Sequence, residues 1–487
     1  MMAHPLSARI AAVLALQPDA PAVEYAGQWF SWAQVGVMAR RIAELTCGGK
    51  VGILLRNRPP HLGALLGVLL GGGCVVVINP ARGDDRTRAD IAALKLPLII
   101  GEPDDLAALV TAAPHTTTVA ISDLDAEPEV APAAIPGLQA GSEPSRPGVA
   151  VWMLTSGTTG PPKRVDLSYD MLAHSVLGLA PAELRRGIAI VNAPLVHIGG
   201  VFRVLQSVAE ARSFVLLDRF ELDRWADAVR KYRPRAVSLV PAALRMVLHS
   251  TLGREDLSSI RAVTSGTAPL SADDADAFTE KFGIPVLTSY AATEFGGGVA
   301  GWTLVDYRRF WRDKRGSVGR ASLGAQLRVV GDDGVPLGPD EPGLLEVKPG
   351  QLGPDTAWMR TTDLARIDAD GFLWILGRAD QAIIRGGFKV MPDDVRAALE
   401  AHPAVRGAAV VGRADDRLGQ TPVAAVELRA GAAADADTLV DFLSTRLARY
   451  EIPTDIAIVD ALPRTPSGKA DLGAVRALIG APGQHGR

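Results

Sequence analysis

The sequence predicts a mixed α/β protein, with a large N-terminal domain of two helix-flanked sheets plus a β-rich subdomain, and a small α+β C-terminal domain. The chain has 487 residues, which is more than one hydrophobic core usually supports, so at least two domains are expected. Apolar strand-like runs alternate with longer helical patterns up to about residue 323. This alternation is the βαβ rhythm of parallel sheets covered by helices.

Strands are expected in the first part wherever a short apolar run ends in turn residues. These runs are "KVGILLRN" (50–57), "CVVVINP" (74–80), "LPLIIGE" (96–102), "TTVAIS" (117–122), "GIAIVNAPLV" (187–196), "SFVLLD" (213–218), "AVSLVP" (236–241), "RAVTSG" (261–266) and "PVLTSYAATE" (285–294). Helices are expected between them, as in "PPHLGALLGVLLGGG" (59–73), "LDRWADAVRKY" (222–232) and from Ser271 onward.

The pattern changes to short strands after residue 323, which indicates the β-rich subdomain, and becomes mixed again from Gln381 onward. The small C-terminal domain is therefore expected in this last part. The later strands are expected in "AQLRVVGDDG" (325–334), "GLLEVKPG" (343–350), "GFLWILGR" (371–378), "VRGAAVVGR" (405–413) and "PVAAVEL" (422–428), with a helix in "MPDDVRAALEAHP" (391–403).

Composition and charge exclude several classes of protein. The formal net charge of −3 provides no basic field for nucleic acid or an anionic membrane. The longest apolar run, residues 62–80, is broken by three glycines at 71–73, so a buried helix followed by a buried strand is favoured over stable membrane insertion. Only Cys47 and Cys74 occur, which is no disulfide framework and indicates a reducing cytoplasm.

The stretch "MLTSGTTGPPKRV" (153–165) combines hydroxyl-bearing residues, glycines, prolines and one lysine. Glycine lets backbone N–H groups converge on an anion, hydroxyls add donors and lysine adds charge, so phosphate is the expected ligand. The P-loop of NTPases is excluded, because Lys163 follows Pro162 and precedes Arg164. A hairpin turn rich in glycine and threonine is the alternative interpretation.

Five further motifs follow in order: "SGTAPL" (265–270), "SYAATE" (289–294), "TTDLAR" (361–366), "GRADQAIIRGGFKVMPDDV" (377–395) and "LPRTPSGKADL" (462–472). Together with "TSGTTGPPK" they resemble the adenylate-forming superfamily, which includes acyl-CoA synthetases, adenylation domains of peptide synthetases and beetle luciferases. The resemblance spans the chain from about Gln28 to near its end. It implies activation of a carboxylate with ATP and Mg²⁺, giving an acyl-adenylate and pyrophosphate.

The resemblance implies a role for each motif residue at the phosphates. Thr293 would contact the α-phosphate, and Glu294 would hold Mg²⁺, a hard cation that prefers carboxylate oxygen. In-line attack on the α-phosphate needs positioning and charge neutralisation more than covalent help from the protein. The β- and γ-phosphates would be wrapped by Thr155, Ser156, Gly157, Thr158, Thr159, Gly160 and Lys163.

The same resemblance implies an adenosine site. Tyr290 would stack on adenine, and Asp363 would accept hydrogen bonds from both ribose hydroxyls with the help of Arg378. Taken alone, Tyr290 would be a core side chain and the two charges would be solvated. The other face of adenine would lie against the backbone of Gly266, Thr267 and Ala268.

Four positions depart from the family pattern. Ser289 stands where an amide side chain often meets the adenine amino group, and Gln381 stands where a second aspartate is frequent. Ala291 and Thr362 occupy positions that are usually glycine. None of these changes removes a charged catalytic group, so we expect an adjusted nucleotide affinity and an active enzyme.

Lys469, in "TPSGK", is implied to be the main catalytic residue of adenylation, bridging the α-phosphate and the substrate carboxylate. It would reach the site on a mobile C-terminal domain, so domains of residues 1–379 and 380–487 are expected, with a hinge at Asp380. In thioester-forming members the small domain rotates after adenylation, and Gly386 and Gly387 would then line the tunnel for a pantetheine thiol.

The segment "APLVHIGGVFRVL" (193–205) resembles the wall of the acyl site. His197 would lie near the reacting carboxylate or the thiol entry, with a packed structural histidine as an equal alternative. No aspartate lies between His197 and Leu205, and a buried ammonium without a partner would be costly. The acid is therefore expected to be aliphatic or aromatic without an amino group. Arg203 raises the idea of a dicarboxylate, but a surface arginine is expected.

Three functions follow from these observations. The first is an acid–thiol ligase that makes an acyl-CoA from ATP, a small carboxylic acid and coenzyme A. The second is a free-standing adenylating enzyme that loads the pantetheine arm of an acyl carrier protein. The third is a non-catalytic nucleotide-binding scaffold or sensor, which the presence of Lys469, Glu294 and Asp363 argues against.

Overall fold

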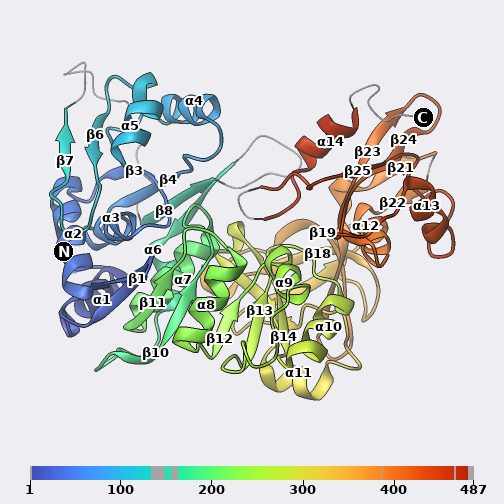
Figure 1. The fold of residues 1–487 in the computed structure, drawn as a ribbon, viewed down its shortest axis with the longest axis horizontal. Helices are drawn as coiled ribbons and strands as arrows, with labels where there is room; N and C mark the ends of the chain where they lie inside the picture. The colour runs from blue at the N-terminus through green and yellow to red at the C-terminus, as the bar shows by residue number, and fades with distance from the viewer. Residues whose placement is uncertain (1–2, 133–147, 155–162, 387, 466–467, 481–487) are drawn as a thin grey trace.

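The computed structural model describes residues 3–132, 148–154, 163–386, 388–465 and 468–480 and confirms the predicted mixed α/β architecture (Figure 1). The described strands of the large N-terminal part form sheets of seven, four, five and four strands, and the C-terminal part has its own sheet. The sequence predicted two helix-flanked sheets. The helix-flanked strands fall into three sheets, because β10 and β12 lie against each other without being hydrogen-bonded neighbours.

The seven-stranded sheet has the order β7-β6-β5-β3-β4-β8-β9, parallel at its centre and antiparallel at both edges. β8 and β9 are hairpin neighbours with Leu154 opposite Arg164, so the predicted phosphate-binding stretch connects two paired strands. The strands are β3 (Lys50–Leu54), β4 (Cys74–Ile78), β5 (Leu98–Gly101), β6 (Thr117–Ala120), β7 (Glu129–Ala131), β8 (Val149–Leu154) and β9 (Arg164–Ser168). The helices of this part are α1 (Pro5–Leu16), α2 (Trp32–Thr46), α3 (Pro59–Leu70), α4 (Asp84–Leu94), α5 (Pro103–Leu109) and α6 (Tyr169–Val176).

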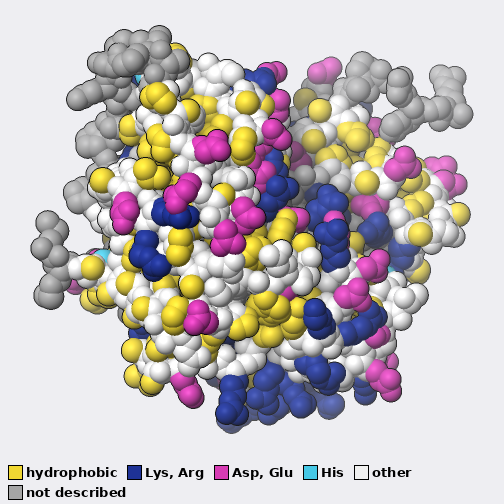
Figure 2. All heavy atoms as spheres, turned by 60° about the vertical axis from the view of Figure 1, so that its left-hand side comes forward, with side chains coloured by type: hydrophobic (Ala, Val, Ile, Leu, Met, Phe, Trp, Pro, Cys, Tyr) yellow, Lys and Arg dark blue, Asp and Glu magenta, His cyan; other side chains and the backbone are white. Residues whose placement is uncertain are grey.

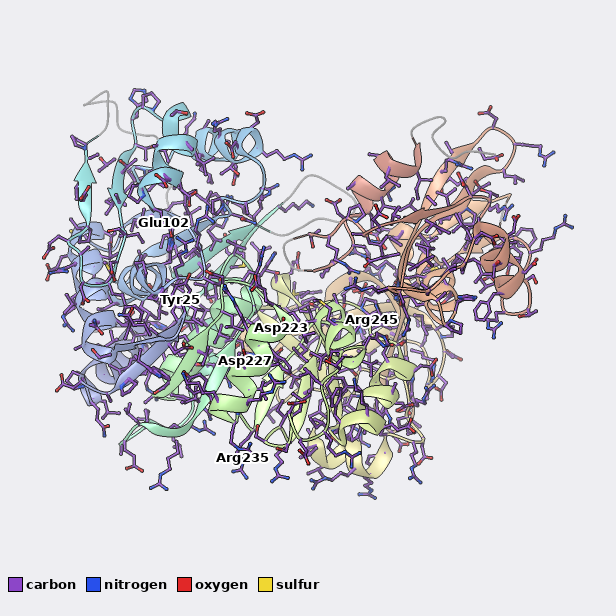
Figure 3. All side chains as sticks on the ribbon, viewed as in Figure 1. Tyr25, Glu102, Asp223, Asp227, Arg235 and Arg245 are labelled. Atoms are coloured by element: carbon purple, nitrogen blue, oxygen red, sulfur yellow. The ribbon has the colours of Figure 1, made fainter. Side chains whose placement is uncertain are left out.

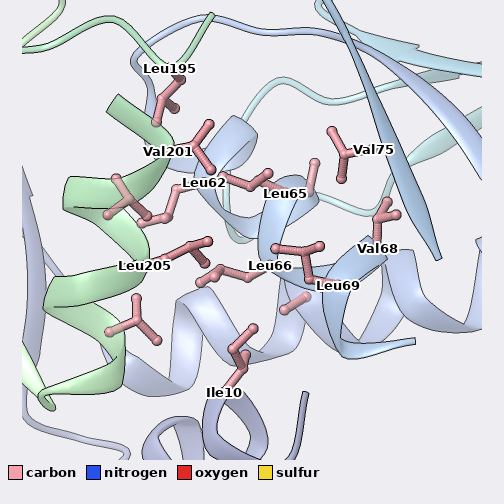
Figure 4. Close-up of a cluster of buried hydrophobic side chains, with 14 of the residues drawn as sticks. Ile10, Leu62, Leu65, Leu66, Val68, Leu69, Val75, Leu195, Val201 and Leu205 are labelled. Atoms are coloured by element: carbon pink, nitrogen blue, oxygen red, sulfur yellow. The ribbon is translucent and has the colours of Figure 1, made fainter. Parts of the chain in front are cut away.

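The largest core packs α3 against α1, α2 and α7 (Ile198–Ala209), as Figure 4 shows for part of it. Leu66 of α3, Ile10 of α1 and Leu205 of α7 are each at most 1% exposed. Burying a leucine side chain contributes about 1.5 to 3 kcal/mol. The apolar run 62–80 is thus a buried helix followed by the buried strand β4, as predicted. No helix of the described residues is long and apolar enough to cross a membrane.

Two further sheets lie at the centre of the molecule in Figure 1. One has the order β10-β11-β1-β2, and the other has the order β12-β13-β14-β15-β16. Their strands are β1 (Pro21–Tyr25), β2 (Gln28–Ser31), β10 (Arg185–Val191), β11 (Arg212–Leu216), β12 (Ala236–Ser238), β13 (Ala262–Ser265), β14 (Val286–Ala292), β15 (Gly297–Gly301) and β16 (Arg320–Ala321). Their helices are α8 (Leu222–Tyr232), α9 (Pro241–Leu248), α10 (Ala272–Phe282) and α11 (Leu304–Phe310).

The predicted β-rich subdomain is a four-stranded antiparallel sheet, and the C-terminal part mixes strands with helices as predicted. Asp380 lies in the short helix η4 (Ala379–Gln381), between these two parts; the domain boundary and the hinge remain predictions. The subdomain strands are β17 (Gln326–Val330), β18 (Gly343–Lys348), β19 (Met359–Ile367) and β20 (Leu373–Arg378). The C-terminal elements are β21 (Ile383–Arg385), β22 (Phe388–Val390), α12 (Pro392–Glu400), β23 (Val405–Asp415), β24 (Gly419–Leu428), α13 (Ala436–Ser444), β25 (Ile456–Val459) and α14 (Leu472–Gly480).

Surface charge is mixed in sign on the face shown in Figure 2. Lys and Arg side chains gather near the lower rim and along the middle of this face, with Asp and Glu side chains between them.

Candidate active site

The residues predicted to hold adenine come from two neighbouring parallel strands. Gly266, Thr267 and Ala268 follow β13, while Ser289 and Tyr290 lie on β14, which pairs with β13. A Cβ atom at Gly266 would lie 2.8 Å from Ser289 Oγ, so the loop can pass this close only with glycine. Thr267 has a φ of 72°, a left-handed conformation that costs a non-glycine residue about 1 to 2 kcal/mol. Such strain clusters at functional sites, and the two predicted segments do lie together.

A hydrogen-bonded pair joins the predicted adenine and ribose residues. The Tyr290 hydroxyl donates to the carboxylate of Asp363 on β19. Asp363 lies opposite Arg378 across the β19–β20 ladder, with Nε of Arg378 3.9 Å from Oδ1 of Asp363. Burial raises the pKa of Asp363, while the Tyr290 hydroxyl and the Arg378 charge act in the opposite direction. The structure therefore brings these three predicted residues together.

Thr362, one of the departures from the family pattern, has a partner that glycine could not have. Its Oγ1 accepts a hydrogen bond of 2.5 Å from Nη2 of Arg378. Arg378 also makes a two-pronged contact with Asp380, from Nε to Oδ1 at 3.0 Å and from Nη2 to Oδ2 at 2.9 Å. The predicted ribose contacts are thus tied directly to the predicted hinge.

Lys469 lies on a C-terminal loop that reaches the large N-terminal part. The Thr465 N–H donates to the Lys469 carbonyl at 2.7 Å, and a Cβ atom at Gly468 would lie 3.6 Å from Cγ2 of Val240. Burial lowers the pKa of the Lys469 ammonium, and the charge of Arg378 lowers it further.

Two carboxylates act on Lys469 in the opposite sense. Glu294, in the short helix η2 (Thr293–Phe295) directly after β14, and Asp363 both raise the pKa of Lys469. Thr293 and Ala291 adjoin Glu294 on this same stretch. Residues from β14, β19, β20 and the C-terminal loop therefore converge on one site.

His197 is the N-cap residue of α7 and interacts electrostatically with the same lysine. Burial lowers the pKa of His197 to about 4, and the charge of Lys469 acts in the same direction. Its Nε2 is buried and has no hydrogen-bond partner among the described residues. Buried polar atoms of structural residues are normally satisfied, so the alternative of a packed structural histidine leaves this nitrogen unexplained.

Asn57 is a positioning residue that the sequence reasoning missed. Its Nδ2 donates to the carbonyls of Ala193 at 3.0 Å and Leu217 at 2.9 Å, and its Oδ1 accepts from the Leu195 N–H at 2.7 Å. These bonds hold the segment that leads into His197. A polar residue two positions after the apolar run "KVGILL" was the available signal.

Several predicted residues are not placed at this site. Thr155, Ser156, Gly157, Thr158, Thr159, Gly160 and Gly387 lie outside the described residues. Lys163 is exposed and immediately precedes β9. Gly386 lies in the turn between β21 and β22, with a φ of 57°, and its N–H donates to the Leu418 carbonyl of the same C-terminal sheet.

Arg203 corrects the prediction of a surface arginine. It is half-buried on α7, and its Nη2 donates to Oγ1 of Thr264 on β13 at 3.1 Å. The reason is the two-sided packing of α7, whose apolar face enters the large core while the face with Arg203 covers β13. Burial lowers the pKa of the Arg203 guanidinium, with Glu210 acting in the opposite sense.

An ion-pair cluster joins the two parts of the molecule at Arg245, which Figure 3 labels near their border. Arg245 Nε lies 2.6 Å from Oδ2 of Asp274 on α10, and Nη2 lies 2.8 Å from Oε2 of Glu400 on α12. The side chains of Arg245 and Glu400 are 13% and 9% exposed. Sequence reasoning missed this cluster because its members are far apart in the chain.

Comparison with known proteins assigns the family. The AMP-binding enzyme profile matches residues 10–353, and the profile of the AMP-binding enzyme C-terminal domain matches residues 394–469. The chain belongs to the AMP-binding enzyme family. This confirms the superfamily predicted from the motifs.

Relatives of this AMP-binding enzyme cover nearly all of its chain. A feruloyl-CoA synthase of Amycolatopsis sp. is 30% identical, over 96% of this chain and 97% of the relative. An indoleacetate–CoA ligase of Aromatoleum aromaticum is 29% identical, over 95% and 96%. The structure of ATP-bound MatB from Rhodopseudomonas palustris matches with a TM-score of 0.82 and 26% identity, over 98% and 99%.

Proposed function

We propose that this AMP-binding enzyme is an ATP-dependent carboxylic acid–CoA ligase. The observation that carries the proposal is the position of Lys469 on a C-terminal loop that lies against Val240, where its charge interacts with Glu294, Asp363 and His197 of the N-terminal part. A cation at this position can neutralise charge that develops during attack on a phosphate. The relatives named above are, by their names, a feruloyl-CoA synthase and an indoleacetate–CoA ligase.

In the first half-reaction, a carboxylate oxygen of the acid attacks the α-phosphorus of ATP. A new P–O bond forms, the bond to the bridging oxygen breaks, and pyrophosphate leaves with the electron pair. Lys469 stabilises the negative charge shared between the α-phosphate and the carboxylate, while Asp363 and Tyr290 position the nucleoside. Neutral His197, with a pKa of about 4, adds no positive charge and offers its free Nε2 to the carboxylate region.

Glu294 would supply a carboxylate ligand to a magnesium ion, and the phosphates of ATP would supply further oxygen ligands. No group of three or more His, Cys, Asp or Glu that could hold a metal occurs among the described residues. Glu294 would hold the ion in the way that Mg²⁺ commonly binds one or two carboxylates together with phosphates. When bound, Mg²⁺ supplies charge neutralisation at the phosphates.

In the second half-reaction, the thiol sulfur of coenzyme A attacks the acyl carbon. The C–S bond forms, the C–O bond to the phosphate breaks, AMP leaves and the thiol proton is released. Gly386 lies in the turn between β21 and β22, and no hydrogen bond among the described residues joins it to Lys469, Asp363 or Glu294. We propose that the C-terminal part reorients about Asp380 between the two steps, so that residues 380–487 act as a lid on residues 1–379.

The proposal also covers the type of acid, the thiol that accepts the acyl group and the cellular compartment. The acid lacks an amino group, because the described α7 segment offers no carboxylate between His197 and Leu205. An acyl carrier protein is the alternative thiol donor. Free Cys47 and Cys74, one exposed and one buried, suit a reducing cytoplasm.

Pyrophosphate release tests the function directly. We would measure it with ATP, Mg²⁺ and a panel of carboxylic acids, each with and without coenzyme A. Steady turnover that depends on both one acid and coenzyme A is the expected result. A single stoichiometric burst would identify a different thiol acceptor, and ATP binding without pyrophosphate release for any acid would support a scaffold instead.

A further inference from the structure

One face of α7 combines open space with a buried positive charge. A Cβ atom added at Gly199 would meet no heavy atom of the described residues within 4 Å, whereas one at Gly200 would lie 2.1 Å from the Pro194 carbonyl oxygen. Arg203 follows Gly199 by four residues, so both lie on the same side of the helix. The guanidinium of Arg203 lies beside Gln206 and Thr264, and Gly199 is one helical turn closer to the N-terminus of α7 than Arg203.

Among the described residues, the hydrogen-bond partners of the Arg203 guanidinium are all neutral. Nη2 donates to Thr264 Oγ1 at 3.1 Å, and Nη1 donates to Gln206 Oε1 at 3.3 Å. The carboxylate of Glu210 is already paired with Arg185 at 2.7 Å and with Arg212 at 3.1 Å. Two acceptors leave several of the five N–H groups of a guanidinium uncommitted.

Placing a cation in a half-buried position with only neutral partners costs free energy unless an anion pairs with it. Proteins rarely keep a buried charge without compensation, because removing a charge from water costs several kcal/mol. Arg203 forms no ion pair with any carboxylate among the described residues, and its partner Thr264 lies at the end of β13, next to the last strand residue Ser265. The missing anion is therefore expected to come from outside the chain.

A second unsatisfied donor lies next to the same helix. The buried Nε2 of Gln351, in the short helix η3 (Gly350–Leu352), has no hydrogen-bond partner among the described residues. A Cβ atom at Gly297, at the start of β15, would lie 3.6 Å from this nitrogen and 3.6 Å from Cζ of Phe202. Phe202 directly precedes Arg203. The hydrogen-bond donors of Gln351 and Arg203 therefore lie on either side of an apolar surface that includes Phe202.

We propose that Arg203 determines substrate specificity by binding a second carboxylate of the acid, so that the substrate is a dicarboxylic acid. The proposal rests on the ligase function proposed above. The reacting carboxylate would lie near His197 and Lys469, and the second would lie along α7 near Gly199 and Arg203. His197 and Arg203 are six residues apart, or roughly 9 Å along a helix, so a short spacer joins the two carboxylates.

Matched pairs of acids test the proposal. Pyrophosphate release would be measured with linear dicarboxylic acids of four to eight carbons, from succinate to suberate, and with the monocarboxylic acids of the same lengths. At least one diacid should exceed its monoacid partner by about tenfold or more in kcat/KM, since a guanidinium–carboxylate pair is strong and specific. Equal or better turnover of the monoacids would overturn the proposal.

Variants separate substrate binding from a merely structural role. Arg203→Met should raise KM for the preferred diacid by about tenfold or more and narrow the gap to the monoacid, while Arg203→Lys should recover part of the preference. Thr264→Val removes a neutral partner of Arg203 and should leave the preference for the diacid in place. An equal loss for every acid in Arg203→Met, with an unchanged preference, would overturn a specificity role. Thermal unfolding of each variant would separate these effects from loss of fold.

Three outcomes separate this proposal from the ligase function itself. Turnover of monocarboxylic acids alone would leave the ligase intact and overturn only the role of Arg203. 4-Oxopentanoate has the same number of carbons as glutarate but carries a neutral carbonyl group instead of a second carboxylate. Equal turnover of these two acids would also contradict the proposal that Arg203 binds a second carboxylate. Absence of pyrophosphate from every acid of both sets would contradict both proposals.

Discussion

The charges of individual residues at the site are set by burial and by neighbours from distant parts of the chain. Lys469 is buried beside Arg378, which lowers the pKa of its ammonium, and beside Glu294 and Asp363, which raise it. His197 is held neutral by burial and by the positive charge of Lys469. An isolated lysine or histidine in the sequence carries none of this information.

Replacing Lys469 with alanine should abolish adenylation while leaving ATP binding. Removal of a group that stabilises transition-state charge typically costs about 10²- to 10³-fold in rate. We expect this loss in acid-dependent pyrophosphate release, with the conversion of a synthetic acyl-adenylate to acyl-CoA much less affected. The exposed Lys231→Ala on α8 is the control and should behave like the wild type. Full pyrophosphate release in Lys469→Ala would contradict the assigned role.

The depressed pKa of His197 predicts a pH-dependent contribution to stability. The group binds a proton more readily when unfolded, at an ordinary pKa of 6.5, than when folded, at about 4. The stability that it contributes is therefore complete above about pH 6.5 and is lost as the pH falls toward 4, by at most about 3 kcal/mol. Urea unfolding of wild type and His197→Gln at pH 5 and pH 8 would measure it. An identical pH dependence in both proteins would contradict the prediction.

At the scale of elements, the N-terminus of α7 packs closely against the preceding segment on one side and has open space on the other. Gly200 lies against the backbone of Pro194, and Asn57 ties Ala193 and Leu195 in place with three hydrogen bonds. Gly199, its neighbour, faces open space among the described residues. Gly200 therefore permits close packing of α7 against Pro194, whereas Gly199 leaves space beside the helix.

This difference predicts opposite effects of two adjacent Gly→Ala substitutions. In Gly200→Ala the new methyl group would lie 2.1 Å from the Pro194 carbonyl oxygen, so the turn must shift, and we expect a loss of about 1 to 3 kcal/mol in unfolding free energy. Gly199→Ala adds no clash and gains helix propensity, so its stability should be unchanged or higher by up to about 1 kcal/mol. Denaturant unfolding of both variants would test this pair. Equal stability in the two variants would contradict the prediction.

At the scale of the whole molecule, polar contacts of described residues join the C-terminal part to the N-terminal part. Arg245 binds Glu400 across the border, and Nη1 of Arg429 lies 3.1 Å from Nδ1 of His249. Figure 3 labels Arg245 near the border between the two parts. Such contacts stabilise one arrangement of two parts without taking part in the chemistry.

Breaking the Arg245 contact should weaken adenylation and spare the second half-reaction. Arg245→Gln removes the cross-border pair, and a bias of about 1 to 2 kcal/mol between two arrangements changes their ratio by roughly 5- to 30-fold. Pyrophosphate release should fall by about this factor, while thioester formation from a synthetic acyl-adenylate should be preserved or faster. Asp274→Asn, which alters only the partner within the N-terminal part, is the matched control. An equal loss in both half-reactions would indicate general damage instead.

Local patterns were sufficient to predict much of this protein. Periodicity and turn residues predicted the βαβ part, the β-rich subdomain and the C-terminal elements. They could do so because helices and strands bury apolar residues at different, regular spacings along the chain. The motifs predicted Tyr290, Asp363 and Arg378 as one group, and the structure brings these three together.

Tertiary structure decided what depends on contacts between distant residues. The separation of β10 from β12, the half-buried guanidinium of Arg203 against Thr264, and the Arg245–Glu400 pair each join residues that no local pattern relates. A side chain is buried or paired because of what the fold places beside it. The sequence by itself therefore determined the class of protein and its family, whereas the packing of α7, the isolation of the Arg203 charge and the contacts across the border required the folded chain.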